Sequence, residues 1–223
     1  FTRPNDLATG GSYTVNKTVV VPSAADQNYV WIVITDYTAQ VYERDGEGNN
    51  QTASAQVGVR HPDLVVTAAT TDANAQSGTA IGVNWTVQNT GDAAAPAGSW
   101  NDRVFLSADG TLNGAILLGT FRFTAGLGVG VEAERSGQVA LPAVADGNYV
   151  FVVKTDANDE VFERAGEDNN TGSSAQPLVL AHPDLGVTGV TGPAAAESGA
   201  TIAVQWTGGN FGTGATPDGD WTD

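Results

Sequence analysis

The sequence predicts an all-β protein made of antiparallel β-sandwich repeats in tandem. Three observations support this prediction. Short segments of alternating apolar and polar residues occur along the chain, turn-forming clusters separate them about every ten residues, and long stretches return after about 120 residues. Helix signals are almost absent. A β-barrel with the same number of strands is the alternative fold.

The repeat is clearest in two acidic stretches. Residues 155–170 read TDANDEVFERAGEDNN and residues 35–50 read TDYTAQVYERDGEGNN, at a separation of 120 residues. The sequence His-Pro-Asp-Leu occurs at 61–64 and again at 182–185, at a separation of 121 residues. We therefore expect the C-terminal half of a repeat at 1–61, a complete repeat at 62–182 and the N-terminal half of another at 183–223.

Each strand expected in the complete repeat has its own pattern. From Ile81 to Val87, apolar residues alternate with polar or small ones, which is typical of a half-buried strand. Residues 148–153 are apolar on both faces, which indicates a central strand. Pro142 ends a long segment at 131–141. The other expected strands are 64–68, 104–106, 116–123 and 178–180.

The tryptophans have two possible roles. Trp85 lies in the alternating strand, so we expect it to anchor the core, with Ile81, Val83, Tyr149 and Phe151 among its neighbours. Trp100 and Trp221 lie in polar loops. Such a tryptophan either covers one end of the core, which we favour, or stacks on a sugar ring.

The composition excludes several classes of function. With 25 acidic and 9 basic residues, the net charge of −16 repels a phosphate backbone, so we expect no nucleic acid partner. No apolar stretch is long enough to span a bilayer, and the chain has no cysteine. The two histidines occupy the same position before Pro-Asp-Leu, and no catalytic motif occurs. We therefore do not expect an enzyme.

The acidic stretches are the candidate metal sites. Calcium binds about six to eight oxygen atoms from carboxylates, amides and backbone carbonyls. Glycines at 46 and 166 could turn a carbonyl toward an ion. The alternative is a corner in which these side chains bond to turn backbone, and Arg44 and Arg164 favour it because they could neutralise a glutamate. A second acidic turn at 109–113 is a weaker candidate. The predicted calcium ligands are Asp36, Glu43, Glu47, Asn49, Asn50, Asp156, Glu163, Glu167, Asn169 and Asn170.

Four segments form a recognisable combination. They are Pro-Asp-Leu at 62–64, the strand with Trp85, the segment from Asp102 to Asp109, and the closing pattern of Glu163, Glu167 and two asparagines. Together they resemble the CARDB family, a cell-adhesion-related domain found in bacteria. The resemblance implies immunoglobulin-like sandwiches in tandem within large exported surface proteins, and hence an extracellular location. The third copy departs from it, because Gly208-Gly209 stands where the second has Val87-Gln88.

Two hypotheses of function follow. The first is a non-catalytic structural and adhesive repeat region of a cell-surface protein or extracellular filament. The second is a carbohydrate-binding module, with Trp100 and Trp221 as its sugar platforms. The half repeats would leave apolar strand faces exposed, so we expect the tail of one chain to dock on the head of the next. Alternatively, the halves are complete in a longer parent chain, or they meet within one chain.

Overall fold

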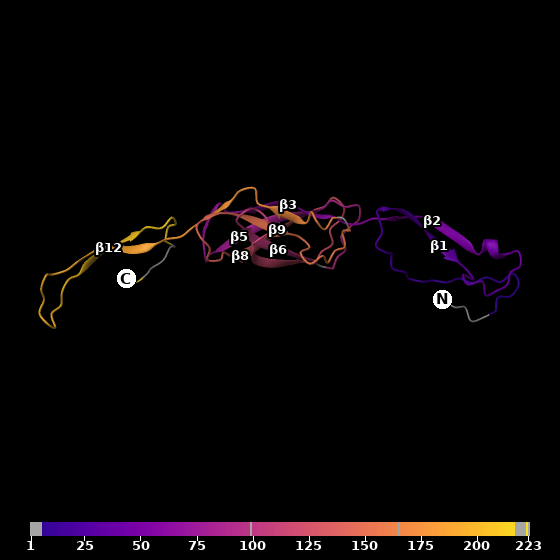
Figure 1. Ribbon diagram of the computed structural model, residues 1–223, viewed down its shortest axis with the longest axis horizontal. Helices are drawn as coiled ribbons and strands as arrows, with labels where there is room; N and C mark the ends of the chain where they lie inside the picture. The colour runs from indigo at the N-terminus through magenta and orange to yellow at the C-terminus, as the bar shows by residue number, and fades with distance from the viewer. Residues whose placement is uncertain (1–5, 99, 165, 217–221, 223) are drawn as a thin grey trace. The chain divides into compact units, whose positions relative to one another are not determined.

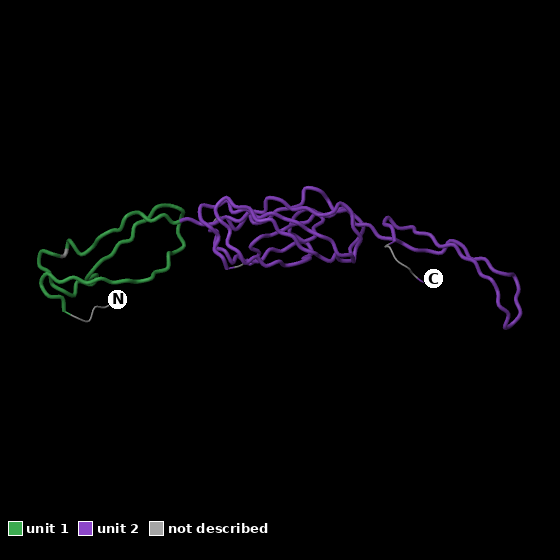
Figure 2. Tube along the Cα trace, turned by 180° about the vertical axis from the view of Figure 1, so that it is seen from behind, with its two compact units in different colours: residues 1–59 green, residues 60–223 purple. Residues whose placement is uncertain are grey.

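The computed structural model describes residues 6–98, 100–164, 166–216 and 222 (Figure 1). In these residues the secondary structure is β, apart from a 3-10 helix η1 (Glu47–Asn49), which agrees with the predicted all-β class. The chain forms two compact units, residues 1–59 and 60–223 (Figure 2). The division into three parts at 61 and 182 stays a prediction. The strands are β1 (Gln27–Ile34), β2 (Gln51–Val59), β3 (Leu64–Thr71), β4 (Asn74–Gln76), β5 (Ala80–Asn89), β6 (Trp100–Ser107), β7 (Ile116–Phe123), β8 (Glu132–Ala140), β9 (Gly147–Lys154), β10 (Thr171–Ser173), β11 (Leu178–Ala181), β12 (Leu185–Thr191) and β13 (Gln205–Asn210).

Strands β3 to β11 form a sandwich of two sheets. The smaller sheet has the order β3-β5-β8, and the larger has the order β4-β11-β9-β6-β7, with β10 also on β9. The described residues place β9 between β11 and β6, as its apolar sequence predicts. Both sheets are open, so the described strands form a sandwich rather than the alternative barrel.

Strand β5 turns its apolar residues inward. Burial alternates along it from Ile81 to Val87, and Trp85 is only 2% exposed. The indole of Trp85 packs against Phe121, with 5.1 Å between ring centroids, and Phe151 of β9 lies in the same core. The predicted core role of Trp85 is therefore confirmed.

The pairing departs from a purely antiparallel sheet at one described edge. Residues Val179 to Ala181 of β11 pair in parallel with Asn74 to Gln76 of β4. The β4 strand follows β3 directly, so it lies on the larger sheet while β3 lies on the smaller one. A strand that crosses between the sheets in this way was not visible in the sequence, because its three residues show no alternation.

The first unit contains the hairpin β1-β2. Its register runs from Gln27 opposite Val59 to Ile34 opposite Gln51, with an irregularity at Val30 to Ile32. Tyr29 donates its hydroxyl to Ala25 O at 3.1 Å, as Tyr149 of β9 does to Ala145 O at 3.0 Å.

Strands β12 and β13 form a second hairpin. The two glycines of the third copy are paired in this hairpin. Gly208 lies opposite Val187, and Gly209 lies opposite Gly186. Only backbone groups form the ladder, so the lost side chains remove packing area but not register.

The part of the chain that is described contains no helix long and apolar enough to cross a membrane.

Candidate functional site

The acidic stretch at 155–170, here called the closing loop, begins with an aspartate that organises its backbone. Asp156 Oδ1 accepts the N–H of Glu160 and Oδ2 accepts that of Val161, both at 2.8 Å. Its own φ is 40°, in the left-handed region that aspartate tolerates better than most residues. Burial raises the pKa of Asp156, and the two N–H bonds partly oppose that rise.

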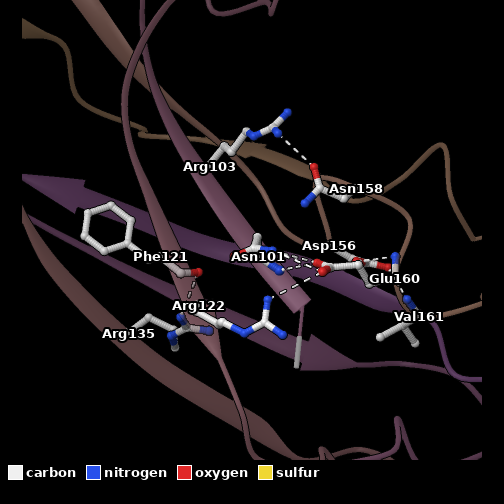
Figure 3. A network of polar contacts seen from close by, with 9 residues as sticks. All are labelled: Asn101, Arg103, Phe121, Arg122, Arg135, Asp156, Asn158, Glu160 and Val161. Carbon is white, nitrogen blue, oxygen red and sulfur yellow. Dashed lines mark hydrogen bonds and ion pairs between the residues drawn. The ribbon is translucent and has the colours of Figure 1, made fainter. Parts of the chain in front are cut away.

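The first half of the closing loop binds to the larger sheet (Figure 3). Glu160 accepts the N–H of Asn101 on β6 at 2.8 Å and lies 3.6 Å from Arg122 on β7. Asn158 Oδ1 accepts a guanidinium N–H of Arg103 at 2.8 Å. The backbone N–H of Ala157 donates to Asn101 O at 2.7 Å. The acidic side chains here fasten a loop to two neighbouring strands.

The second half of the closing loop binds to the start of β3. Glu163 Oε1 accepts the N–H of Leu64 at 2.9 Å, and Asn169 Nδ2 donates to Asp63 Oδ1 at 2.9 Å. Glu167 Oε1 accepts the N–H of Glu163 at 3.0 Å. A Cβ at Gly166 would lie 2.6 Å from Asp63 Oδ1, so a larger residue would displace the Asp63 carboxylate from its bond to Asn169.

Some oxygen atoms of the loop are buried without a described hydrogen-bond partner. They are Glu163 Oε2, Glu167 Oε2 and Asn170 Oδ1, and Asn170 Nδ2 shares this condition. Glu163 is 3% exposed and Asn170 is 1% exposed. Burial, together with the nearby charges of Glu167 and Asp156, raises the pKa of Glu163 to about 8, although the neighbouring side-chain amide of Asn170 and the N–H of Leu64 oppose the rise.

The structure separates the predicted metal ligands of this loop. Asp156 already accepts two backbone N–H groups, and Asn169 donates to Asp63. Glu163, Glu167 and Asn170 each have a buried side-chain oxygen without a described hydrogen bond. Among the described residues no group of three or more histidine, aspartate or glutamate side chains is placed to hold a metal ion. This geometry favours the hydrogen-bonded corner at Asp156, and calcium binding stays a prediction.

The first unit repeats the same corner at 35–50. Asp36 accepts the N–H groups of Gln40 and Val41 at 2.8 and 2.9 Å. Thr35 N donates to Asn50 O at 2.8 Å, as Thr155 N does to Asn170 O at 2.9 Å. Asn49 N donates to Gly46 O at 3.1 Å, and Gly46 N to Glu43 O at 3.0 Å. The side chain of Glu47, also a predicted ligand, lies outside the described part.

In the weaker candidate turn, one carboxylate oxygen of Asp109 accepts bonds from within the turn. Asp109 Oδ1 accepts the N–H and the hydroxyl of Thr111 at 2.9 and 2.8 Å, and the hydroxyl of Ser107 at 3.0 Å. These bonds hold the pKa of Asp109 below its usual range. The turn closes the connection between β6 and β7.

A second corner, which the sequence analysis did not find, surrounds Asn89. This side chain has no exposed surface. Its Oδ1 accepts the N–H groups of Asp63 and Gly91, and its Nδ2 donates to Ala93 O and Leu127 O, at 2.8 to 3.1 Å. A signal was available, because Asn89 recurs 121 residues later as Asn210.

The corner at Asn210 has matching bonds. Asn210 Oδ1 accepts the N–H groups of Asp184 and Gly212 at 2.9 and 3.0 Å, and Nδ2 donates to Gly214 O at 2.8 Å. The His-Pro-Asp-Leu segments therefore enter β3 and β12 through the same kind of turn.

A buried polar network, also missed from the sequence, joins the two sheets at Asp102. This carboxylate accepts the indole N–H of Trp85 at 2.8 Å and the hydroxyl of Thr155 at 2.8 Å, and it pairs with Arg135 at 2.9 Å. Burial raises the pKa of Asp102, and the positive charge of Arg135 opposes this. The guanidinium of Arg135 also lies over the rings of Trp85 and Phe123.

Trp100 is a buried residue. It is 0% exposed and packs on Phe123, with ring centroids 4.5 Å apart. The prediction that it covers the core is confirmed, and its alternative role as a sugar platform is wrong, because the indole has no exposed face. Trp221 lies outside the described residues. His61 lies against the ring of Phe162 in an edge contact at 5.2 Å.

These corners and the sandwich define a small β-module whose loops are closed by polar side chains. The chain belongs to the CARDB family, whose model matches residues 61–174. No curated protein sequence matches it.

Solved structures with similarity to this chain include a CARDB domain from Pyrococcus furiosus. Its crystal structure in complex with di-metal ions has 19% identity and a TM-score of 0.40, and covers 54% of this chain and 89% of that one. Its solution structure has 21% identity and a TM-score of 0.39, and covers 54% and 98%. A β-glucosidase from Erythrobacter marinus has 16% identity and a TM-score of 0.36, and covers 56% of this chain but 16% of the enzyme.

Proposed function

We propose that this chain is a non-catalytic structural and adhesive part of an exported cell-surface protein. The CARDB family, an adhesion-related domain, supports this proposal. The observation that carries the proposal is that acidic side chains of the closing loop bind the loop to neighbouring strands. Glu160 and Glu163, which could serve an open site, instead hold Asn101 of β6 and Leu64 of β3. A net charge of −16 keeps a protein of this kind soluble.

The proposal includes calcium as a stabiliser of the closing loop. Carboxylate and amide oxygens are the ligands that calcium prefers, and the buried oxygens of Glu163, Glu167 and Asn170 are of these types. When bound, the ion would neutralise two buried carboxylates. The residues themselves orient the loop, because Glu163 holds Leu64 and Glu167 holds the N–H of Glu163.

The proposal also includes head-to-tail association of copies of the chain. The hairpin β12-β13 exposes residues that match the buried face of β3-β5: Trp206 is 49% exposed, whereas its counterpart Trp85 is 2% exposed. On β1, Trp31 is 41% exposed, whereas its counterpart Phe151 is 1% exposed. In the sandwich, the counterparts Trp85 and Phe151 lie in one core. By analogy, the proposed occupant of the exposed β1-β2 face is the β12-β13 hairpin of a second copy.

An adhesion assay tests the proposed function. Beads coated with the chain are expected to aggregate with each other or to attach to cells, and excess free chain is expected to compete. The matched control is a bead coated with the heat-unfolded chain. Beads that neither aggregate nor attach would contradict an adhesive role. Binding to an array of glycans alone would instead favour the carbohydrate-binding module.

A further inference from the structure

The outer face of the larger sheet gathers positive charge in an acidic protein. Arg103 of β6 lies directly opposite Lys154 of β9, and Arg122 of β7 lies opposite Asn101, two residues before Arg103. Residues opposite each other in an antiparallel pair, and residues two apart in one strand, point to the same side of a sheet. Asp102, between Asn101 and Arg103, is buried on the other side. The three cations therefore share one face, here called the basic face.

The basic face breaks a common rule of sheet structure. Like charges directly opposite each other are destabilising, and Arg103 lies opposite Lys154. The guanidinium of Arg103 donates to the uncharged amide oxygen of Asn158 at 2.8 Å, and its Nε is buried without a described partner (Figure 3). Lys154 and Arg122 lie 3.5 and 3.6 Å from acidic side chains of the closing loop, but such partly exposed pairs contribute little. Residues that break such a rule are expected at functional surfaces.

The outer face of the smaller sheet presents the opposite charge. Glu132 and Glu134 of β8 are exposed and lie opposite Gln88 and Thr86 of β5. Neither glutamate has a hydrogen bond or an ion pair in the described part of the chain. Arg135, the next residue, points into the sandwich instead. Two carboxylates on this face are therefore available to a partner.

The two faces carry charges at similar spacings. Glu132 and Glu134 lie two residues apart on one strand, which places them about 7 Å apart. Arg122 and Arg103 are diagonal neighbours on adjacent strands, at about 7–8 Å. We propose that the basic face of one copy binds the outer face of the smaller sheet of a second copy, with the two arginines against the two glutamates. A guanidinium suits this role because its planar fork matches a carboxylate.

The contact rests on the proposed adhesive role and adds a side-to-side mode to the head-to-tail one. It uses neither hairpin, and it joins unlike faces, so it can continue from copy to copy. Only exposed charges form it, so we expect a weak contact that depends on salt.

Sedimentation of the full chain with Val187→Asp tests the contact, because this substitution acts on β12 and leaves both outer faces of the sandwich unchanged. At about 0.1 M salt, where charges act over about 10 Å, this chain is expected to associate as its concentration rises. At about 1 M salt, where charges act over about 3 Å, the association is expected to weaken at least about tenfold. A chain that stays monomeric at about 0.1 M salt would exclude a second copy as the partner of the basic face. An association that high salt does not weaken would overturn the charged contact.

Charge reversal tests which residues meet. Arg122→Glu and Glu134→Arg, each added to the Val187→Asp chain, are expected to weaken the association at least about tenfold, because like charges then face each other. An equal mixture of the two variants is expected to associate as the Val187→Asp chain does, because each reversed residue then meets the other. Failure of the mixture to recover would overturn the pairing.

The matched control is Arg164→Glu, which makes the same change of net charge at an exposed residue outside both faces. It is expected to keep the association, and a loss equal to that of Arg122→Glu would overturn the contact as an effect of net charge alone. The bead assay tests adhesion by itself. Beads that adhere although the Val187→Asp chain stays monomeric would leave the adhesive role in place and remove this contact.

Discussion

Asp102 shows how one side chain can connect both sheets of the sandwich. It lies on β6 of the larger sheet and bonds to Trp85 and Arg135 of the smaller one, with no exposed surface of its own. A buried charge of this kind is tolerated only when it is paired and hydrogen-bonded. The network therefore determines how the two sheets are aligned, and it adds little to the free energy of unfolding.

The substitution Trp85→Ala is expected to lower the unfolding free energy by about 3–5 kcal/mol, because it removes a large core aromatic. Trp85→Phe keeps a ring but loses the N–H donor of Asp102, so we expect a smaller loss of about 1–3 kcal/mol. Denaturant unfolding measures both. Equal losses would show that the bond to Asp102, rather than the ring, dominates.

The unfolding free energy is expected to depend on pH through Glu163. Its folded pKa of about 8 lies above the ordinary 4.5, so the folded state holds a proton that the unfolded state releases between these values. The contribution of Glu163 to stability is therefore complete below about pH 4.5 and falls as the pH rises to about 8, by at most about 1.4 kcal/mol per pH unit.

The variant Glu163→Gln isolates this contribution in a chelator, because glutamine keeps an oxygen for the N–H of Leu64 and does not titrate. The unfolding free energy of the unsubstituted chain is expected to fall relative to the variant from about pH 5 to about pH 8. Parallel pH profiles would mean that the Glu163 carboxyl has no raised pKa.

At the scale of elements, corners rather than strands distinguish this sandwich. The closing loop binds β3, β6 and β7, and the Asn89 corner binds the entry to β3 and the segment before β8. Each corner uses a short polar side chain to satisfy backbone groups that strand pairing leaves unbonded. Side chains therefore hold the ends of these strands in addition to strand pairing.

The substitution Asn89→Ala is expected to lower the unfolding free energy by about 3 kcal/mol, because it removes four hydrogen bonds and leaves the part-buried N–H groups of Asp63 and Gly91 without their acceptor. Asn89→Asp keeps the acceptor and loses the two donor bonds, so its loss is expected to be smaller unless the buried charge dominates. Hydrogen exchange at the N–H groups of Asp63 and Gly91 reports the corner directly. Slow exchange of both in Asn89→Ala would contradict the role given to this residue.

The alternation from Ile81 to Val87 was sufficient to predict β5 and the burial of Trp85, because one face of that strand lies on the core. The pairing of Asp102 with Arg135 was not predictable, since the two residues lie on strands of different sheets and neither interrupts a pattern. The acidic loop was found from its repetition. Its division into bonded Asp156 and partly unbonded Glu163 depends on contacts with Leu64, 99 residues away, that no local pattern contains.

At the scale of the whole molecule, the two hairpins expose the apolar residues that the sandwich buries. Val187 and Val190 of β12 are exposed, whereas Val66 and Ala69, their counterparts on β3, are buried. Exposed apolar faces of this kind favour association, and contact between unlike faces extends from copy to copy unless it closes into a ring.

The chain is therefore expected to sediment as assemblies whose size grows with concentration. Val187→Asp is expected to shift this association to concentrations at least about tenfold higher, because it places a charge in the apolar face. The control Val129→Asp changes an exposed valine outside both hairpins, 54% exposed against 65% for Val187, and is expected to have no effect. A chain that sediments as a monomer at every concentration would exclude a second copy as the occupant.

The entry to β3 has a mechanical consequence. The residues at the start of β3 are held by loops as well as by β5. His61 O accepts the N–H groups of Asp92 and Ala93, the N–H of Asp63 donates to Asn89, and the N–H of Leu64 donates to Glu163. Tension that arrives along the backbone is therefore expected to load these loop attachments together with the first β3-β5 pairs, so that the strand is not expected to open one pair at a time.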